Sequence, residues 1–550
     1  MLLIINVLAF GFALLAFIKT TLFINVTITY ILIALIAFFG HSEDFLGTTL
    51  LSRPLVLAPL VGLVLGDLTQ GIIIGGTLEL IFMGNIKVGA AIPPDVISGG
   101  VLGTAFAIIS GKGPAIALAI AVPVSILAEL VVSGLFVFRS VLNKKFNQYA
   151  DAGDYKKIQL LHIVSGLLKP VLMGLIVWLA LQLGAAAMKS FLDMIPAWVQ
   201  SGLQVAGNML PTLGFALLMN LMFTKTMAPY FFLGFILAAY LRLPVIAIGG
   251  IAVVIAFIIT QNKAVEADDD DDFGEEATPE SPHENLLTRG DIRYMFFRSL
   301  ALEANFNFET WQNTGFAFAI IPALKRLYSS RQQMAAALKR HLQFFNTSPY
   351  GSTLIIGITA AMEERNSVDE DFDEETISSV KAGLMGPLAG VFDSLFWGTF
   401  KVIAAGVGAS LALKGNLLGP VLFLLIFNVP HLLLRYQLTF TGYKTGTKFL
   451  QDLAKNKVMD KLTKGSAILG LMVVGAMPAT LMSIVTPLKI GGGDSAVGVQ
   501  GVLNQVVPFI IPLGLTFLVF YFVKKGAKTT WLLLGLLALG FIGSSLHIFA

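Results

Sequence analysis

The chain contains no cysteine. That absence excludes disulfide bonds, thiolate metal sites and cysteine nucleophiles. The sequence also lacks a Walker loop, a glycine-rich dinucleotide-binding pattern after a strand, and a His-Glu-x-x-His motif. Its six histidines never fall at zinc-ligand spacing. We therefore expect no bound cofactor and no metal site, and any energy source must come from another molecule.

Charge is also scarce, at 13% of 550 residues, while 56% are hydrophobic and the mean hydropathy is +0.80. A soluble protein carries about 25% charged residues. The composition therefore predicts an all-α membrane protein, a polytopic helical bundle. Several apolar stretches are shorter than the roughly 20 residues that span a bilayer and are broken by glycine or proline. These breaks predict re-entrant hairpins in both halves.

The acidic residues are concentrated between residues 266 and 285, which hold ten acids and neither lysine nor arginine. So little apolar surface predicts a disordered linker over 263–285. The linker separates a domain at 1–262 from a second domain at 286–550. Residues 1–25 form an extra apolar segment without a basic start or a cleavage site, which predicts a retained helix.

Without the acidic run, 37 basic residues face 24 acids, a balance of +13. The positive-inside rule is the first explanation of such an excess, and a docking face for an anionic partner is a compatible alternative. Much of the excess lies in the second domain, where residues 288–345 have amphipathic helical spacing and face the cytosol in our interpretation. The residues that we select as candidate docking groups are Arg293, Arg298, Arg326 and Arg331.

Polar residues inside the apolar first domain are the main candidates for a binding site, because burying them is costly. They fall among glycines between residues 66 and 95 and comprise Asp67, Glu79, Asn85, Lys87 and Asp95. Carboxylates and amides suit sugar hydroxyls. Three alternatives stay open: Glu79 pairs with Lys87, Asp67 caps a helix, and the glycines serve helix packing.

The second domain has three weaker candidate segments, at 305–309, 341–349 and 383–394. The first contains Asn307 and Glu309, which we expect to close the site. The third places glycines and a proline around Asp393, a pattern typical of a broken helix or hairpin tip.

At these residues the chain resembles the mannose family of phosphotransferase-system permeases. The Arg53-Pro54-Leu55 segment and the run from Gly75 to Glu79 are similar to the IIC subunit. Segments Asn307–Glu309, His341–Pro349 and Lys381–Gly390 are similar to the IID subunit. The two subunits are normally separate proteins, whereas here they are fused. Phe306 and Phe392 also depart from the family pattern, where tryptophan and glycine are common.

The resemblance implies a sugar carrier in the bacterial cytoplasmic membrane, typically a trimer, with the linker on the cytoplasmic side. A cytoplasmic IIAB or IIB protein then transfers phosphate from a phosphohistidine to the bound sugar, of the mannose, fructose, sorbose or N-acetylgalactosamine class. The membrane subunits are not themselves phosphorylated. In this interpretation Glu79 is the first candidate proton acceptor and Asp95 the second, with Asn85, Lys87, Asn307 and Glu309 binding sugar.

Two other functions stay open. An ion-coupled secondary transporter would share the hairpins and the membrane-embedded acids, but it would not explain the basic block at 288–345. A receptor for a bacteriocin or phage is possible as a secondary role.

Overall fold

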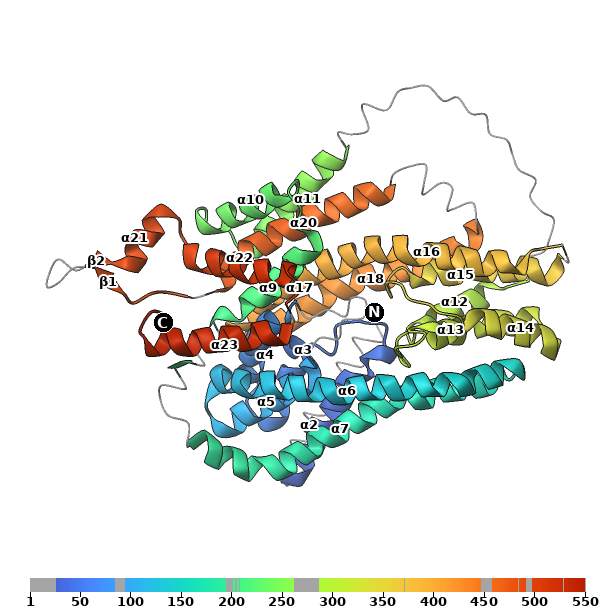
Figure 1. Cartoon of the computed structure of the whole chain (residues 1–550), viewed down its shortest axis with the longest axis horizontal. Helices are drawn as coiled ribbons and strands as arrows, with labels where there is room; N and C mark the ends of the chain where they lie inside the picture. Colours follow the sequence, from blue (N-terminus) through green and yellow to red (C-terminus); the bar gives the residue numbers. More distant parts are fainter. Residues whose placement is uncertain are drawn as a thin grey trace.

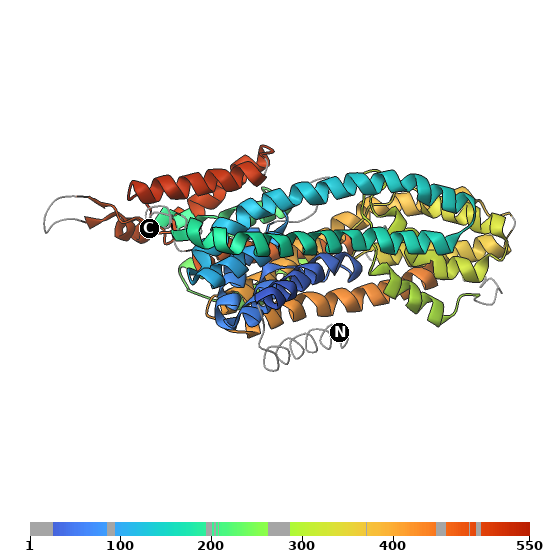
Figure 2. The ribbon, with the colours of Figure 1, turned by 90° about the horizontal axis from the view of Figure 1, so that it is seen from below.

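The computed structural model describes residues 26–84, 94–193, 201–202, 205–206, 208–261, 286–369, 371–446, 458–482, 484–490, 497–527 and 529–549. Its elements are helical except for one antiparallel pair, β1 (Lys489–Ile490) with β2 (Val497–Gly498). Most helices run along the long axis of the molecule (Figures 1 and 2). The prediction of an all-α bundle is confirmed. The predicted N-terminal helix at 1–25 and the linker at 263–285 lie outside the described residues.

The first domain consists of helices with the following bounds: α2 (Val26–His41), η1 (Ser42–Phe45), α3 (Pro54–Leu65), α4 (Leu68–Phe82), α5 (Val96–Ser110), α6 (Gly113–Asp151), α7 (Tyr155–Asp193), α9 (Pro211–Met222), α10 (Ala228–Ala239) and α11 (Val245–Gln261).

The second domain continues with α12 (Arg289–Ser299), α13 (Asn313–Leu327), α14 (Arg331–His341), α15 (Ser352–Val368), α16 (Glu374–Leu395), the π-helical turn η3 (Phe396–Phe400), α17 (Lys401–Ala412), α18 (Leu418–Thr445), α20 (Val458–Leu481), α21 (Val499–Val506), α22 (Ile510–Lys524) and α23 (Thr529–Ser545).

Helices α3 and α4 form a tight hairpin whose turn is specified by sequence. Gly66 ends α3 in the left-handed conformation, with φ 92°, which favours glycine. Asp67 then caps α4 by accepting a hydrogen bond from the Gln70 backbone N–H at 3.0 Å. A Cβ on Gly62 would lie 2.8 Å from the Cα of Gly71, so the two helices cross where neither has a side chain. Asp67 and these glycines therefore have the structural roles that the sequence left open.

Among the described residues, five helices are long and apolar enough to cross a membrane, or six if the bent pair α21–α22 is one span. Shorter apolar helices, including α3, α4 and α5, pack between them. The 39 residues of α6 extend about 58 Å. That length exceeds the roughly 30 Å hydrocarbon core, so α6 also reaches into water.

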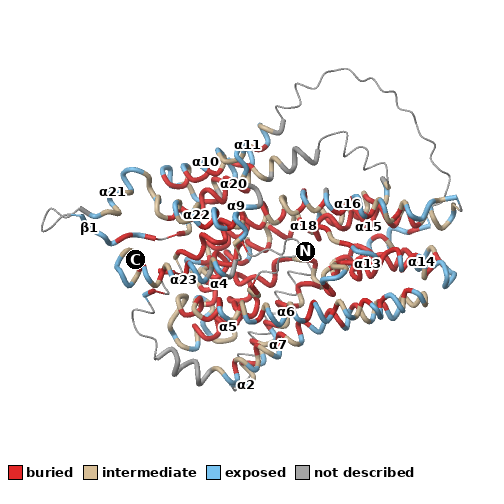
Figure 3. Tube along the Cα trace, viewed as in Figure 1, coloured by how far each residue is buried: buried red, intermediate tan, exposed pale blue. Residues whose placement is uncertain are grey.

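The aqueous end of the α6–α7 hairpin packs against α13 and α14 of the second domain (Figure 1). Buried residues are densest where α3, α4, α9 and α17 meet, whereas α6, α7 and α14 expose one side (Figure 3). The main hydrophobic core joins both domains, since it contains Leu55 and Phe215 together with Phe316, Phe396 and Val473. The two domains therefore fold around one shared interior.

The prediction of a break near Asp393 is wrong. Helix α16 is continuous from Glu374 to Leu395, and the irregularity falls later, in the π-helical turn η3. A Cβ on Gly383, Gly386 or Gly390 would meet no atom within 4 Å, so these glycines line an open face of the helix. None of these three glycines has a positive φ, so they remain part of the regular helix.

Candidate functional site

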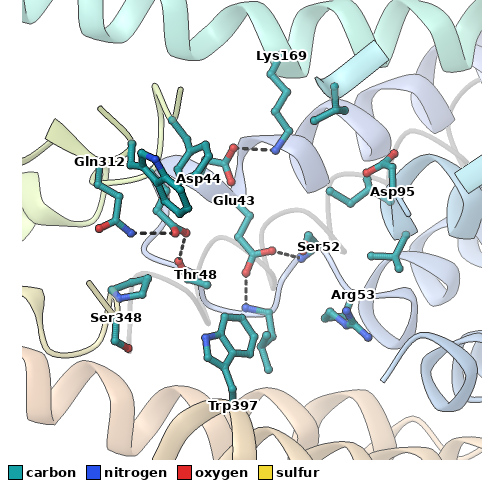
Figure 4. Close-up of a pocket in the computed structure, with 18 of the residues that line it drawn as sticks. Glu43, Asp44, Thr48, Ser52, Arg53, Asp95, Lys169, Gln312, Ser348 and Trp397 are labelled. Carbon is teal, nitrogen blue, oxygen red and sulfur yellow. Dashed lines mark hydrogen bonds and ion pairs between the residues drawn. The ribbon is translucent and has the colours of Figure 1, made fainter. Parts of the chain in front are cut away.

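A cavity of about 310 Å³ lies between the two domains (Figure 4). The first domain contributes η1, the loop that follows it, the start of α5, and side chains from α6 and α7. The second domain contributes the loops at 303–312 and 346–349 and the end of α16. The site is therefore incomplete in either domain alone.

The loop at 46–53 forms one wall of the cavity and is held from within by Glu43. The Glu43 carboxylate is buried and accepts hydrogen bonds from the backbone N–H groups of Leu50 and of Ser52, the latter at 3.1 Å. Thr48 and Leu50 adopt positive φ values of 59° and 62°. Side chains of these types rarely adopt that conformation, and such strain occurs chiefly at functional sites.

The second domain holds the same loop from outside. Glu303 accepts a hydrogen bond from the Thr48 hydroxyl at 2.8 Å. On α18, Asn428 donates to the Thr49 carbonyl at 2.8 Å and Arg435 donates to the Gly47 carbonyl at 3.0 Å. The strained loop is thus fixed by the contact between the domains.

Arg53 is one of the cations that line the cavity, and Glu79 holds it in place. Glu79 is fully buried and does not line the cavity; its carboxylate lies 2.8 Å from Nη2 and 2.9 Å from Nε of Arg53. Arg53 Nη2 also donates to the Phe82 carbonyl at 2.6 Å. Lys87, the partner that the sequence suggested for Glu79, lies outside the described residues, as does Asn85.

Asp95 lines the cavity directly (Figure 4). It caps α5 by accepting a hydrogen bond from the Ser98 backbone N–H at 3.0 Å, and His41 Nε2 lies 3.6 Å away. Both contacts are made by Oδ2. Asp95 is therefore the sequence-predicted carboxylate that a ligand in the cavity would reach.

The cavity carries more acid than base. Two cations, Arg53 and Lys169, line it, and Lys169 forms an ion pair of 2.7 Å with Asp44. The carboxylates that line it are Glu43, Asp44, Asp95, Glu129, Glu303 and Asp393. This balance suits a neutral or cationic polyhydroxylated ligand better than an anion. Phe306, Trp311 and Trp397 supply aromatic surface.

Asn307 and Glu309 do not line this cavity. The fully buried Asn307 shapes its own loop, since its Oδ1 accepts hydrogen bonds from the backbone N–H groups of Glu309 and Thr310 at 3.1 and 2.9 Å. The Asn143 amide of α6 donates to Asn307, Thr310 and Glu309 at 3.0, 3.0 and 2.8 Å. These residues join the domains and place the neighbouring Phe306 and Trp311 at the cavity.

The candidate docking arginines are not brought together. Arg331, at the start of α14, donates to the Ala152 carbonyl at the tip of the α6–α7 hairpin at 2.5 Å. Arg293 is exposed on α12. Arg298 is buried, and it shares a separate surface pocket with Arg326.

Sequence reasoning missed the acids Glu43 and Asp44 and the aromatic residues Trp311 and Trp397 of the cavity. The sequence signal for the two acids is the segment His41-Ser42-Glu43-Asp44, where charges directly follow the apolar helix α2. Charges at such a position also suit an ordinary helix end at the membrane surface, so the pattern alone does not separate the two.

Two family models match the chain in succession. The model described as the sorbose-specific IIC component of the phosphotransferase system matches residues 27–258, and that of the mannose/fructose/sorbose family IID component matches residues 286–549. The chain belongs to the mannose family of phosphotransferase-system permeases. It is a IIC–IID fusion, as the resemblance implied.

Two sequence relatives, one for each domain, agree with this assignment. The sorbose-specific EIID component of Klebsiella pneumoniae is 43% identical over 47% of this chain and 97% of its own length. The mannose-specific EIIC component of Escherichia coli K12 is 30% identical over 43% of this chain and 89% of its own length. A cryo-EM structure of the mannose transporter ManYZ with a microcin is 38% identical over 48% of this chain and 98% of that chain, with a TM-score of 0.29.

Proposed function

We propose that this multi-pass sugar permease binds a hexose or an amino sugar in the cavity between its domains and presents it to a phosphorylated IIB protein. The observation that carries the proposal is the cavity itself, which both components build and which combines carboxylates with aromatic surface. Carboxylates accept hydrogen bonds from sugar hydroxyls, and an acidic lining also tolerates a protonated amine. An ion-coupled transporter without phosphorylation is not favoured, because both domains match phosphotransferase components.

In this proposal Asp95 accepts the proton of the reacting sugar hydroxyl. The hydroxyl oxygen forms a bond to phosphorus while the phosphohistidine N–P bond of IIB breaks, and the hydroxyl proton passes to the Asp95 carboxylate. Phosphoryl transfer needs mainly positioning and a group to take that proton. In this proposal Glu79 is not the proton acceptor that the sequence favoured. It positions Arg53 instead, because it does not line the cavity and its carboxylate is paired with Arg53.

Asp95→Asn tests this assignment. The amide keeps the shape of the side chain but cannot take the proton, so sugar binding should stay within about tenfold while phosphorylation by IIAB slows at least a hundredfold. Glu129→Gln, the same change elsewhere in the cavity, is the matched control and should phosphorylate at a near-normal rate. A normal rate of sugar phosphorylation in the Asp95→Asn variant would refute the role of Asp95 as proton acceptor.

The substrate itself can be identified with a panel of sugars in a permease-deficient bacterium that is supplied with matching IIAB.

We also propose that exposed basic residues at the aqueous end dock IIB, with Arg293 and Arg331 as the principal candidates. Charge reversal at Arg293 should weaken IIB binding most at low salt, since exposed charges are screened over about 8 Å at physiological ionic strength. Unchanged IIB affinity at every salt concentration would place the docking face elsewhere. Family members lead us to expect a homotrimer in the cytoplasmic membrane, with the linker on the cytoplasmic side.

A further inference from the structure

A second pocket of about 320 Å³ lies on the surface between α7, α12 and α13, and it shares no lining residue with the sugar cavity. Its polar lining consists of Gln159, Asp291, Tyr294, Arg298, Lys325 and Arg326. The base is apolar, formed by Ile321 and Pro322.

Arg298 forms the inner wall of this pocket and is only 9% exposed. Its Nε donates to the Phe318 carbonyl at 2.6 Å, and its guanidinium carbon lies 3.7 Å from the centre of the Phe318 ring. Within the part of the chain that the structure describes, the buried Nη2 has no hydrogen-bond partner. A buried guanidinium nitrogen without a partner is costly, so this atom indicates a ligand that accepts hydrogen bonds.

The electrostatics of the pocket favour an anion. Lys325 and Arg326 are exposed at its rim and add two positive charges to that of Arg298. The one acid in the lining, Asp291, is already engaged: its carboxylate accepts hydrogen bonds from the Thr288 backbone N–H at 2.9 Å and hydroxyl at 2.7 Å. Burial leaves the charge of Arg298 incompletely solvated and so lowers its pKa. A phosphate group matches a guanidinium with free N–H groups.

The pocket lies at the level where α7 enters the apolar layer. Lys156 and Lys157 are exposed just before Gln159, whereas the exposed residues after it are apolar, with Leu160 63% exposed. One and two turns further on the Gln159 face, Ile163 and Leu167 are exposed as well.

Across the pocket, two aromatic side chains mark the same level. Tyr294 and Phe297 of α12 are 54% and 53% exposed. Exposed aromatic residues of this kind concentrate at the boundary between lipid and water, and basic pockets between helices at that boundary bind lipid headgroups.

From these observations we infer that the α7–α12–α13 pocket binds the phosphate headgroup of an anionic phospholipid. Arg298 Nη2, Lys325 and Arg326 contact the phosphate oxygens, and an acyl chain follows Ile163 and Leu167 along α7. The inference does not depend on the proposed sugar chemistry. It gives Arg298 and Arg326 a role other than docking IIB.

Native mass spectrometry of the full chain, released from nanodiscs of phosphatidylglycerol or phosphatidylcholine, tests the inference. The double variant Lys325→Gln/Arg326→Gln changes only exposed side chains. At about fivefold per basic residue, it should lower phosphatidylglycerol affinity on the order of 25-fold, with phosphatidylcholine unaffected. Arg298→Gln should have a comparable effect, and its folding can be checked separately by thermal unfolding.

The matched control is Lys144→Gln/Lys145→Gln, which removes two exposed charges from α6 outside the pocket and should leave phosphatidylglycerol binding within about twofold. Equal losses in both double variants would reduce the effect to non-specific charge and refute the site. Competition by inorganic phosphate without any preference for phosphatidylglycerol would assign the pocket to a free anion. Unchanged lipid binding with weakened IIB affinity would assign it to the protein partner.

Discussion

Arg53 and Glu79 form a buried ion pair beside the cavity between the domains, which is our proposed sugar site, and of the two residues only Arg53 lines the cavity. Removing one partner leaves the other charge buried, at a cost of about 3–5 kcal/mol. Glu79→Gln should therefore destabilise the protein and weaken sugar binding together. The double variant Glu79→Gln/Arg53→Met removes both charges and should recover thermal stability without recovering sugar binding, measured by thermal unfolding with and without sugar. Full stability in Glu79→Gln alone would contradict this account.

The environment of Glu363 predicts how the stability of the second domain depends on pH. Buried on α15, it accepts hydrogen bonds from Arg340 Nε and His341 Nε2, both at 2.8 Å, and from the Tyr328 hydroxyl at 2.6 Å. Burial alone would raise the pKa of Glu363, but the hydrogen bonds and charges of His341 and Arg340 outweigh it and lower the pKa to about 2. Burial, opposed by Glu363, lowers the pKa of His341 to about 4.

Both shifts make the fold less stable in acid. Between the ordinary His pKa of about 6.5 and 4, the unfolded chain takes up the His341 proton more readily than the folded chain, and the same holds for Glu363 between about 4.5 and 2. The protection factors of amides in α14 and α15, which compare observed exchange with intrinsic exchange at the same pH, should therefore fall as pH drops below about 6.5. In the His341→Gln variant the loss of protection should begin only below about pH 4.5, where Glu363 alone remains to take up a proton. An unchanged onset would show that other groups control it.

At the scale of elements, the sequence predicts helices better than it predicts how they meet. Capping and turn residues act locally, so the Gly66-Asp67 turn and the start of α5 at Asp95 can be inferred from sequence. Glu79 and Arg53 are 26 residues apart, and Thr48 and Glu303 are 255 apart. Such pairings depend on tertiary packing, which one sequence does not encode in any local pattern. Asp95 could be found because its capping role is local, whereas Glu43 was missed because a charge directly after an apolar helix also suits an ordinary helix end.

The contact between the α6–α7 hairpin and the second domain contains both buried and exposed polar connections. Asn143 makes three hydrogen bonds across the interface, whereas Asp151 and Lys339 form an ion pair with side chains 60% and 58% exposed. Asn143→Ala removes these three hydrogen bonds, at about 1–3 kcal/mol in total, and should weaken association of separately expressed domains about 5- to 150-fold. Asp151→Ala should cost less than about 1 kcal/mol. Co-purification measures both, and equal effects would contradict the distinction.

At the scale of the whole molecule, the two domains are connected by far more than the chain that joins them. They share one hydrophobic core, and buried polar groups cross the interface on several helices, including His162 to the Thr314 hydroxyl and Arg435 to the Gly47 carbonyl. Composition predicts the membrane class and the position of the boundary. It does not predict this shared interior, because hydrophobic periodicity shows which face of a helix is buried and not which domain covers it.

The shared interior leads to a prediction about the acidic segment at 263–285: it serves as a tether and contributes nothing else to transport. Twenty residues of such composition would reach on the order of 25 Å, enough to join neighbouring subunits. A protease site placed there and cut after assembly should leave sugar uptake and phosphorylation by IIAB near the uncut level, because the core and the cavity walls stay in contact. The control is a cut chain carrying Asn143→Ala, which should lose more of its second domain on dilution than the cut chain without the substitution. Loss of uptake in the cut chain while both domains still co-purify would show that the segment has a role of its own.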